Sequence, residues 1–232
     1  MQDAQTCFVP EGTGGEVFVS VVCDGAGSAV FGGQGASLVC RSIRQAVSRH
    51  FASTARLPTD AELLSWVDSA RDRIFAVAQR RSLTPRDFAS TLVWAIAGPS
   101  ETIVVHVGDG CVVVNDAREG QWTAASWPDH GEYASMTRFV TDDPQSEARI
   151  SRRANAVCSI VLFTDGLERL ALDFSAMQPF SGFFDGICHP LFRSQSVGQD
   201  DVLRAHLKDF LNSSAVNART DDDKTLVIAA RI

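Results

Sequence analysis

The sequence predicts one α+β domain with layered, mainly antiparallel sheets, and the order of its elements is the reason. Two helix-like segments stand next to each other in the first third of the chain, and several short strand-like runs follow them. A parallel sheet would instead place a helix between successive strands. The 232 residues exceed a common single-domain length, but no Pro/Ser-rich linker divides them and one sandwich can hold that many. We therefore expect a single domain over residues 1–232.

The first predicted elements are one strand and two helices. Residues 16–23, EVFVSVVC, have the β-branched and aromatic side chains of a buried strand. Residues 32–53 place apolar side chains near helical spacing, and their start, GGQGAS, lacks the Gly-Lys-Ser/Thr of a phosphate-binding loop, so we interpret it as a helix start. A second helix follows Pro58, because Thr59 and Glu62 form a capping box ahead of an apolar stripe.

Most of the remaining elements are strands. The runs FASTLVWAIAG, ETIVVHVGDG and CVVVNDA are broken by Gly-Pro and Gly-Asp-Gly, which predicts a meander of consecutive antiparallel strands. Residues 118–156 are polar and irregular. Residues 156–166 predict a strand, 200–213 a helix and 224–232 a final strand. Residues 173–199, rich in Phe, Gly and Pro, show no clear period, and we expect a loop or flap there.

Composition restricts the class of protein. The hydrophobic fraction is 45%, and no apolar run approaches the length that crosses a bilayer, so we expect no membrane partner. The net charge of -7 disfavours a nucleic-acid-binding surface. No targeting leader is expected, and the six cysteines show neither tight pairing nor Cys-x-x-Cys. We interpret them as reduced, mostly buried thiols of a cytoplasmic protein, with disulfides or zinc as the alternative.

Four aspartates stand at the ends of strand-like runs: Asp24, Asp109, Asp165 and Asp222. The first three are each followed by Gly, which lets the backbone turn sharply and lets a ligand approach a carbonyl. Any one Asp-Gly is explained as a turn dipeptide, and the run DDD at 221–223 as a solvated turn. Four carboxylates at one sheet edge repel one another unless a cation lies among them. Oxygen ligands select hard ions, so the pattern predicts a Mg²⁺ or Mn²⁺ centre.

Five segments follow one another along the chain: VVCDGAGSA, FASTLVWA, VVHVGDGCVVV, IVLFTDGLERL and DDDKTLVIAA. In this order they resemble the successive motifs of the metal-dependent serine/threonine protein phosphatases of type 2C. The similarity is greatest to the compact bacterial branch, which carries Asp-Gly-Ala-Gly-Ser-Ala. The resemblance spans nearly the whole chain. It implies a four-layer α-β-β-α sandwich, in which two antiparallel sheets pack face to face with helices outside each, in agreement with the element order.

The resemblance implies a role for each aspartate. Asp24 would bridge two Mn²⁺ or Mg²⁺ ions, and the carbonyl of Gly25 would complete the protein ligands of the second. Asp165 and Asp222 would hold the first ion, and Asp109 would help hold a third, weaker one. The two ions would generate a bridging hydroxide that attacks phosphorus in line. No covalent phosphoenzyme is then needed, and the chain has no Cys-x5-Arg motif of the cysteine-dependent phosphatases.

The sequence departs from the family pattern at three places. Relatives place a phosphate-binding Arg upstream of the segment that begins at Gln2, and here the sequence printed begins at Met1. Three explanations are open: the natural chain starts upstream, another Arg takes the place of this one, or phosphate binding is weak. Gln2 stands where many relatives have a Glu ligand, with Asp3 beside it, so both are candidates for the outer shell of the second ion. Ala26 replaces a His that protonates the leaving group. His130 or water bound to a metal ion could serve instead, although His130 is more simply a solvated loop residue.

The resemblance also implies partners. Substrates would be phosphorylated proteins made by a cognate Ser/Thr kinase, and the phosphatase would act as a monomer without nucleic acid. Residues 173–199 are the candidate specificity segment, with core packing as the alternative. The alternative function is a catalytically weak or inactive relative that binds phosphoproteins, and a two-metal nuclease is disfavoured by the net charge of -7.

Overall fold

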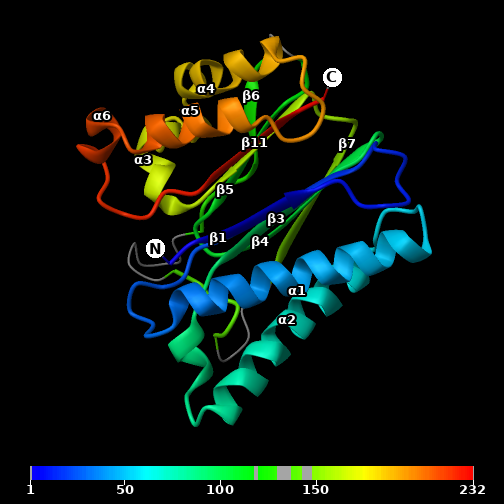
Figure 1. Ribbon diagram of the computed structural model, residues 1–232, viewed down its shortest axis with the longest axis vertical. Helices are drawn as coiled ribbons and strands as arrows, with labels where there is room; N and C mark the ends of the chain where they lie inside the picture. Colours follow the sequence, from blue (N-terminus) through cyan, green and yellow to red (C-terminus); the bar gives the residue numbers. More distant parts are fainter. Residues whose placement is uncertain (1, 118–119, 130–136, 143–147, 232) are drawn as a thin grey trace.

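The computed structural model describes residues 2–117, 120–129, 137–142 and 148–231. Two antiparallel sheets are stacked face to face, and helices cover the outer face of each sheet (Figure 1). The chain therefore forms four layers in the order α-β-β-α, which confirms the predicted fold class. None of the helices in these residues is long and apolar enough to cross a membrane.

Each sheet is entirely antiparallel; the strands of the first sheet follow the chain order, and those of the second do not. The first sheet has the order β1-β2-β3-β4-β7, and the second has the order β11-β8-β5-β6. The strands of the first sheet are β1 (Ala4–Phe8), β2 (Phe18–Cys23), β3 (Leu92–Ala97), β4 (Glu101–Val107) and β7 (Arg149–Ala154). Those of the second are β11 (Leu226–Ala230), β8 (Ser159–Phe163), β5 (Cys111–Asn115) and β6 (Trp122–Ser126). A small hairpin pairs β9 (Leu172–Asp173) with β10 (Gln178–Pro179).

The helices fall into two groups, one on each side of the stacked sheets (Figure 1). The long helices α1 (Gly32–Ser53) and α2 (Asp60–Arg80) cover the first sheet. The second sheet is covered by α3 (Glu168–Ala171), α4 (Ser181–Arg193), α5 (Asp201–Leu211) and α6 (Ser214–Asn217). Two short 3-10 turns, Pro85–Phe88 and Asp165–Leu167, complete the regular structure.

Three hydrophobic clusters fill the three spaces between the four layers. Because side chains alternate along a strand, each central strand contributes to two of them. In β5, Val112 and Val114 belong to the cluster between the sheets, whereas Cys111 and Val113 belong to the cluster shared with α4. The cluster between α1, α2 and the first sheet is the largest. Both faces of the central strands are therefore buried, which explains why those strands are continuous apolar runs in the sequence.

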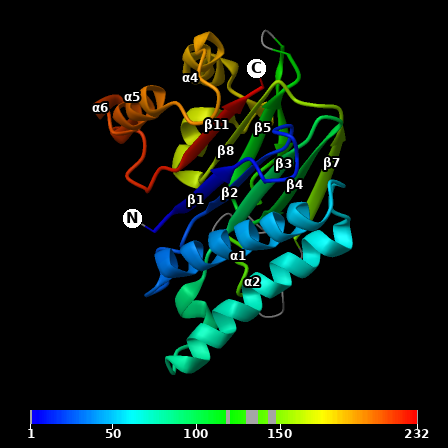
Figure 2. The same ribbon diagram turned by 45° about the vertical axis from the view of Figure 1, so that its right-hand side comes forward.

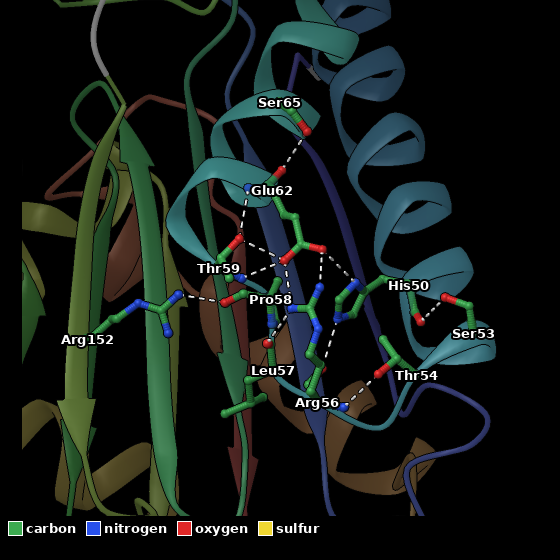
Figure 3. A network of polar contacts seen from close by, with 10 residues as sticks. All are labelled: His50, Ser53, Thr54, Arg56, Leu57, Pro58, Thr59, Glu62, Ser65 and Arg152. Atoms are coloured by element: carbon green, nitrogen blue, oxygen red, sulfur yellow. Dashed lines mark hydrogen bonds and ion pairs between the residues drawn. The ribbon is translucent and has the colours of Figure 1, made fainter.

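The predicted capping box of α2 is confirmed. Thr59 accepts a hydrogen bond from the Glu62 backbone N–H, while the Glu62 carboxylate accepts one from the Thr59 N–H at 2.8 Å. Figure 3 shows the Arg56 and His50 side chains directed at the same carboxylate. Arg56 donates to both of its oxygens, at 2.8 and 2.5 Å, and the ring of His50 lies 3.8 Å away. One carboxylate thus joins the end of α1, the loop and the start of α2.

The meander prediction was wrong at its third strand. β3 and β4 pair as expected, but β5 lies in the second sheet. The chain crosses between sheets at Gly108–Gly110, where Gly108 has a φ of +105°, a conformation that favours glycine. Successive apolar runs do not reveal this crossing, because β4 and β5 are each buried on both faces.

Two segments predicted as irregular contain regular structure. Residues 118–156 include the edge strands β6 and β7, and β7 has the polar sequence RISRRA because much of it faces solvent. Residues 173–199 include α4, whose Phe183, Phe184 and Cys188 are buried against the second sheet. Two glycines and Pro190 interrupt the helical pattern of α4, so its period was not visible.

Candidate metal centre

In the first sheet, two aspartates lie at the same end. Asp24 directly follows β2, and Cys23, the last residue of β2, pairs with Ala4. Asp3 directly precedes Ala4, so the two aspartates stand on neighbouring strands. The Asp24 carbonyl accepts a hydrogen bond from the Thr91 N–H at 2.8 Å, and Asp24 N–H donates to the Thr91 hydroxyl at 3.0 Å. The start of β3 therefore holds the Asp24 backbone in place.

In the second sheet, the strand register brings three more aspartates to one end. Phe163, the last residue of β8, pairs with both Cys111 and Leu226, the first residues of β5 and β11. The turns beside these paired residues contain Asp109, Asp165 and Asp222. Antiparallel pairing thus places the end of one strand next to the starts of its neighbours.

Two contacts join the segments that carry the aspartates of the first sheet to those that carry the aspartates of the second. The Thr164 hydroxyl donates to Asp3 Oδ2 at 3.0 Å, and the Gln2 N–H donates to Asp223. Figures 1 and 2 both show the N-terminal end of β1 beside the segment that leads into β11. The five aspartates therefore occupy one edge of the sandwich, formed by both sheets.

The carboxylates at this edge change one another's ionisation. Burial, a hydrogen bond to Asp3 and the negative charges of Asp3, Asp165 and Asp109 raise the pKa of Asp24 to about 10. Burial and the charges of neighbouring carboxylates, Asp109 first, raise the pKa of Asp165 to about 7. Such mutual repulsion requires protons or cations among the carboxylates. Glu168, which also raises the pKa of Asp165, is an acidic neighbour that the sequence analysis missed.

Asp3, which we expected in the outer shell of the second ion, contacts both Asp24 and the second sheet. Its carboxyl forms a hydrogen bond with Asp24, and its Oδ2 accepts from Thr164. Its Oδ1 is buried and has no hydrogen-bond partner among the described residues. A buried carboxylate oxygen without a hydrogen-bond donor is suited to binding a cation. Gln2, in contrast, contributes backbone contacts: its carbonyl accepts from the Gly25 N–H at 3.2 Å.

The glycines after the aspartates are required by close packing. A Cβ on Gly25 would lie 2.2 Å from the carbonyl carbon of Gly32 and 2.6 Å from the Gly33 nitrogen, so the start of α1 packs directly on the Asp24 turn. A Cβ on Gly166 would lie 2.0 Å from the carbonyl oxygen of Asp223. The glycine-rich start of α1 is thus a packing surface, as its interpretation as a helix start implies.

Asp109 and Asp222 differ in their surroundings. Asp109 is 6% exposed and accepts a hydrogen bond from the Thr137 hydroxyl at 2.6 Å. Asp222 is exposed, and its Oδ1 accepts from the Asp223 N–H at 2.8 Å. The exposed carboxylate can rotate toward an ion at little cost, whereas the buried one is held in place. His130, the candidate acid, lies outside the described residues.

The donor set fits a hard divalent cation, since it consists of carboxylates and backbone carbonyls without Cys or His ligands. Within the described ranges, no three Asp, Glu, His or Cys side chains are already arranged around an ion position. Burial and a hydrogen bond to Asp3 raise the pKa of Asp24 to about 10, so Asp24 retains its proton at neutral pH. Binding of a cation to these carboxylates would release this proton.

Comparison with known proteins agrees with the four-layer sandwich. The model of the protein phosphatase 2C family matches residues 1–212. The chain is 38% identical over 213 residues to serine/threonine-protein phosphatase 3 of Escherichia coli K12, covering 90% of this chain and 81% of that protein. The chain therefore belongs to the protein phosphatase 2C family.

Solved structures share the fold at lower sequence identity. Serine/threonine phosphatase Stp1 from Staphylococcus aureus superimposes with a TM-score of 0.64 and 15% identity, over 100% of this chain and 89% of that one. The catalytic domain of serine threonine protein phosphatase PstP, solved in complex with 2 manganese ions, gives 0.59 and 16% identity, over 97% and 96%. These likenesses support the four-layer architecture.

Proposed function

We propose that Asp24, Asp165 and Asp222, with the Gly25 carbonyl, hold two Mn²⁺ or Mg²⁺ ions in this protein serine/threonine phosphatase. The observation that carries the proposal is the gathering of five aspartates, Asp3, Asp24, Asp109, Asp165 and Asp222, at an edge where both sheets meet. Burial first, and neighbouring carboxylates next, raise the pKa of Asp24 to about 10 and that of Asp165 to about 7. We further propose that Asp109 helps to hold a third ion and that Asp3 contacts the ions directly. The family match supports the phosphatase activity itself.

The chain's own residues would position the reaction. Divalent ions bound here would supply an acidified water and stabilise charge on the phosphoryl oxygens. Thr91 holds the Asp24 backbone, and Thr164 holds Asp3 while its hydroxyl accepts from the Thr225 N–H at 3.2 Å. Thr164 thus holds a carboxylate and Thr91 the backbone that carries one, as partners of metal ligands do.

The substrate class follows from the same proposal. We propose that the substrates are phosphoserine and phosphothreonine proteins and that a cognate kinase supplies their phosphoryl groups. We further propose that the phosphatase acts as a monomer in the cytoplasm. The alternative is a catalytically weak or inactive relative that binds phosphoproteins, and it rests on departures from the family pattern such as Gln2 and Ala26. The family match and the named phosphatase relative support the enzyme, so we do not favour this alternative.

Two variants test the metal centre directly. We expect Asp24→Asn and Asp165→Asn to abolish Mn²⁺-dependent hydrolysis of an aryl phosphate and of a phosphothreonine peptide, and to weaken Mn²⁺ binding measured by calorimetry. The matched control is Asp116→Asn, because Asp116 lies past the other end of β5 and pairs with Arg153. Full activity of Asp24→Asn or Asp165→Asn, or full activity of the unmodified protein in the presence of EDTA, would contradict the proposal.

A further inference from the structure

Two buried thiols lie beside the carboxylate edge and take no part in the proposed reaction. Cys23 is the last residue of β2, and Cys40 lies in the middle of α1. Their sulfur atoms are 3.4 Å apart. Both side chains belong to the cluster between α1 and the first sheet. None of the other four cysteines, all of which lie in the described residues, contacts a second cysteine in this way.

A cavity gives access to one of the two thiols. It has a volume of about 350 Å³ and lies between β1 and α1, where it is lined by Cys40, Arg41, Arg44 and the backbone start of β1. Cys40 is 4% exposed, and its thiol donates weakly to the Ala4 carbonyl at 3.4 Å. Cys23 is 0% exposed and lies behind Cys40. A small oxidant that enters the cavity therefore meets Cys40 first.

We propose that Cys23 and Cys40 form a reversible disulfide in response to peroxide, with Cys40 attacked first. The Cys40 sulfur attacks one oxygen of hydrogen peroxide, the O–O bond breaks, and a sulfenic acid and one water form. The Cys23 sulfur then attacks the Cys40 sulfur, the S–O bond breaks, and a second water leaves. The two thiols lose two electrons and two protons in total, and the peroxide is reduced to two waters. A dithiol reductant reverses the reaction.

The two sulfur atoms have a short distance to close. A disulfide has an S–S length of about 2.05 Å, so the sulfurs must approach by roughly 1.4 Å from their distance of 3.4 Å. The movement has a consequence because of the neighbours of Cys23. Cys23 directly precedes Asp24, and it pairs with Ala4, which directly follows Asp3. Drawing Cys23 toward α1 therefore displaces both carboxylates, and this part of the inference rests on the proposed metal centre.

The disulfide itself is tested on the unmodified full chain. The protein is treated with hydrogen peroxide, its free thiols are alkylated, and its peptides are mapped by mass spectrometry. We expect one linked pair, Cys23 with Cys40, which disappears on reduction with dithiothreitol. In Cys23→Ser the sulfenic acid of Cys40 should be trapped by dimedone, and in Cys40→Ser no dimedone adduct should form at Cys23. The matched control Cys7→Ser removes an exposed thiol on β1 and should leave the linked pair unchanged.

The wild-type peptide map needs no variant to fold, so it decides the proposal alone. Two alkylated thiols at Cys23 and Cys40 after oxidation, or a link to another cysteine, would overturn it. The effect on the metal centre is measured separately, by Mn²⁺ calorimetry of the oxidised and reduced protein. We expect oxidation to weaken Mn²⁺ binding by about 10- to 100-fold, the range found for disturbed partners of metal ligands. Equal affinities would overturn the coupling, and a reduced protein that binds no Mn²⁺ would instead contradict the proposed function.

Discussion

Gly25 combines two requirements in one residue. The family resemblance implies that its carbonyl binds an ion, and the structure adds that a side chain there would collide with the start of α1. We expect Gly25→Ala to destabilise the fold by about 1–3 kcal/mol, as overpacking of backbone does, and to weaken Mn²⁺ binding because the Asp24 turn shifts. Urea unfolding and calorimetry measure the two effects.

The control for this substitution is Gly186→Ala in α4. A Cβ at Gly186 meets nothing within 4 Å, and the residue is helical, so alanine should stabilise the fold by about 0.5–1 kcal/mol. If Gly25→Ala were as stable as the parent protein, the packing argument would be wrong.

Asp3 and Gln2 are neighbours that should respond differently to substitution. Asp3 hydrogen-bonds to Asp24 and has one buried oxygen without a hydrogen-bond donor in the described part of the chain, whereas the described contacts of Gln2 are made by its backbone. We expect Asp3→Asn to weaken Mn²⁺ binding by at least about tenfold and Gln2→Ala to change it by less than about twofold. Calorimetry at constant pH measures both. The reverse ranking would restore Gln2 as the more important residue.

Four of the five aspartates at this edge stood out in the sequence, whereas Asp3 was expected only as an outer-shell residue. Asp24, Asp109 and Asp165 each follow a long apolar run, so their place at a strand end is visible. Asp3 precedes β1, a strand of five residues with alternating exposure that no apolar run announces. The hydrogen bond between Asp3 and Asp24 depends on the pairing of Ala4 with Cys23, a register that single-sequence patterns do not provide.

At the level of elements, the junction of α1 and α2 depends on one cap. The Thr59 side chain and the Glu62 carboxylate satisfy each other's backbone N–H groups (Figure 3). We expect Thr59→Ala to destabilise the protein by about 1 kcal/mol, the usual cost of a lost helix N-cap. Equilibrium urea unfolding measures it. Ser65→Ala, which removes a hydroxyl donating to the Glu62 carbonyl at 2.9 Å, is the control and should stay within about 0.5 kcal/mol. Equal effects of both changes would contradict this account.

The elements also show where sequence patterns stop being informative. The strands β2, β3, β4, β5 and β8 and the helices α1, α2 and α5 agree with the predicted ranges, because each has a clear apolar period. The assignment of β5 to the second sheet was missed, since Gly108–Gly110 could equally close a hairpin. The helix α4 was missed because its glycines and Pro190 dilute the stripe formed by Phe184 and Cys188.

For the whole molecule, the four-layer prediction succeeded through motif order, because the same five motifs in series are typical of one topology. The three clusters between the layers are consistent with that topology, and they place every motif aspartate at one edge. The repulsion between carboxylates at that edge was predicted, but its size could not be, because the pKa values depend on distances between the two sheets. Those distances are set by packing in the cluster that the sheets share.

The raised pKa values give the whole fold a pH dependence that a metal ion should remove. The Asp24 and Asp165 pKa values are about 10 and about 7, both above the usual 3.8, so the folded metal-free protein retains protons that the unfolded chain has released. The free energy of unfolding should therefore fall as pH rises through about 7 and on toward about 10. A divalent ion displaces these protons, so its stabilising effect should grow over the same range.

Thermal unfolding between about pH 6 and 9, with EDTA or with Mg²⁺, measures both trends. In Asp24→Asn the decline with EDTA should be smaller, because one of the two retained protons is absent. A Mg²⁺ stabilisation that is constant across this range would show that the ion does not bind at the protonated carboxylates.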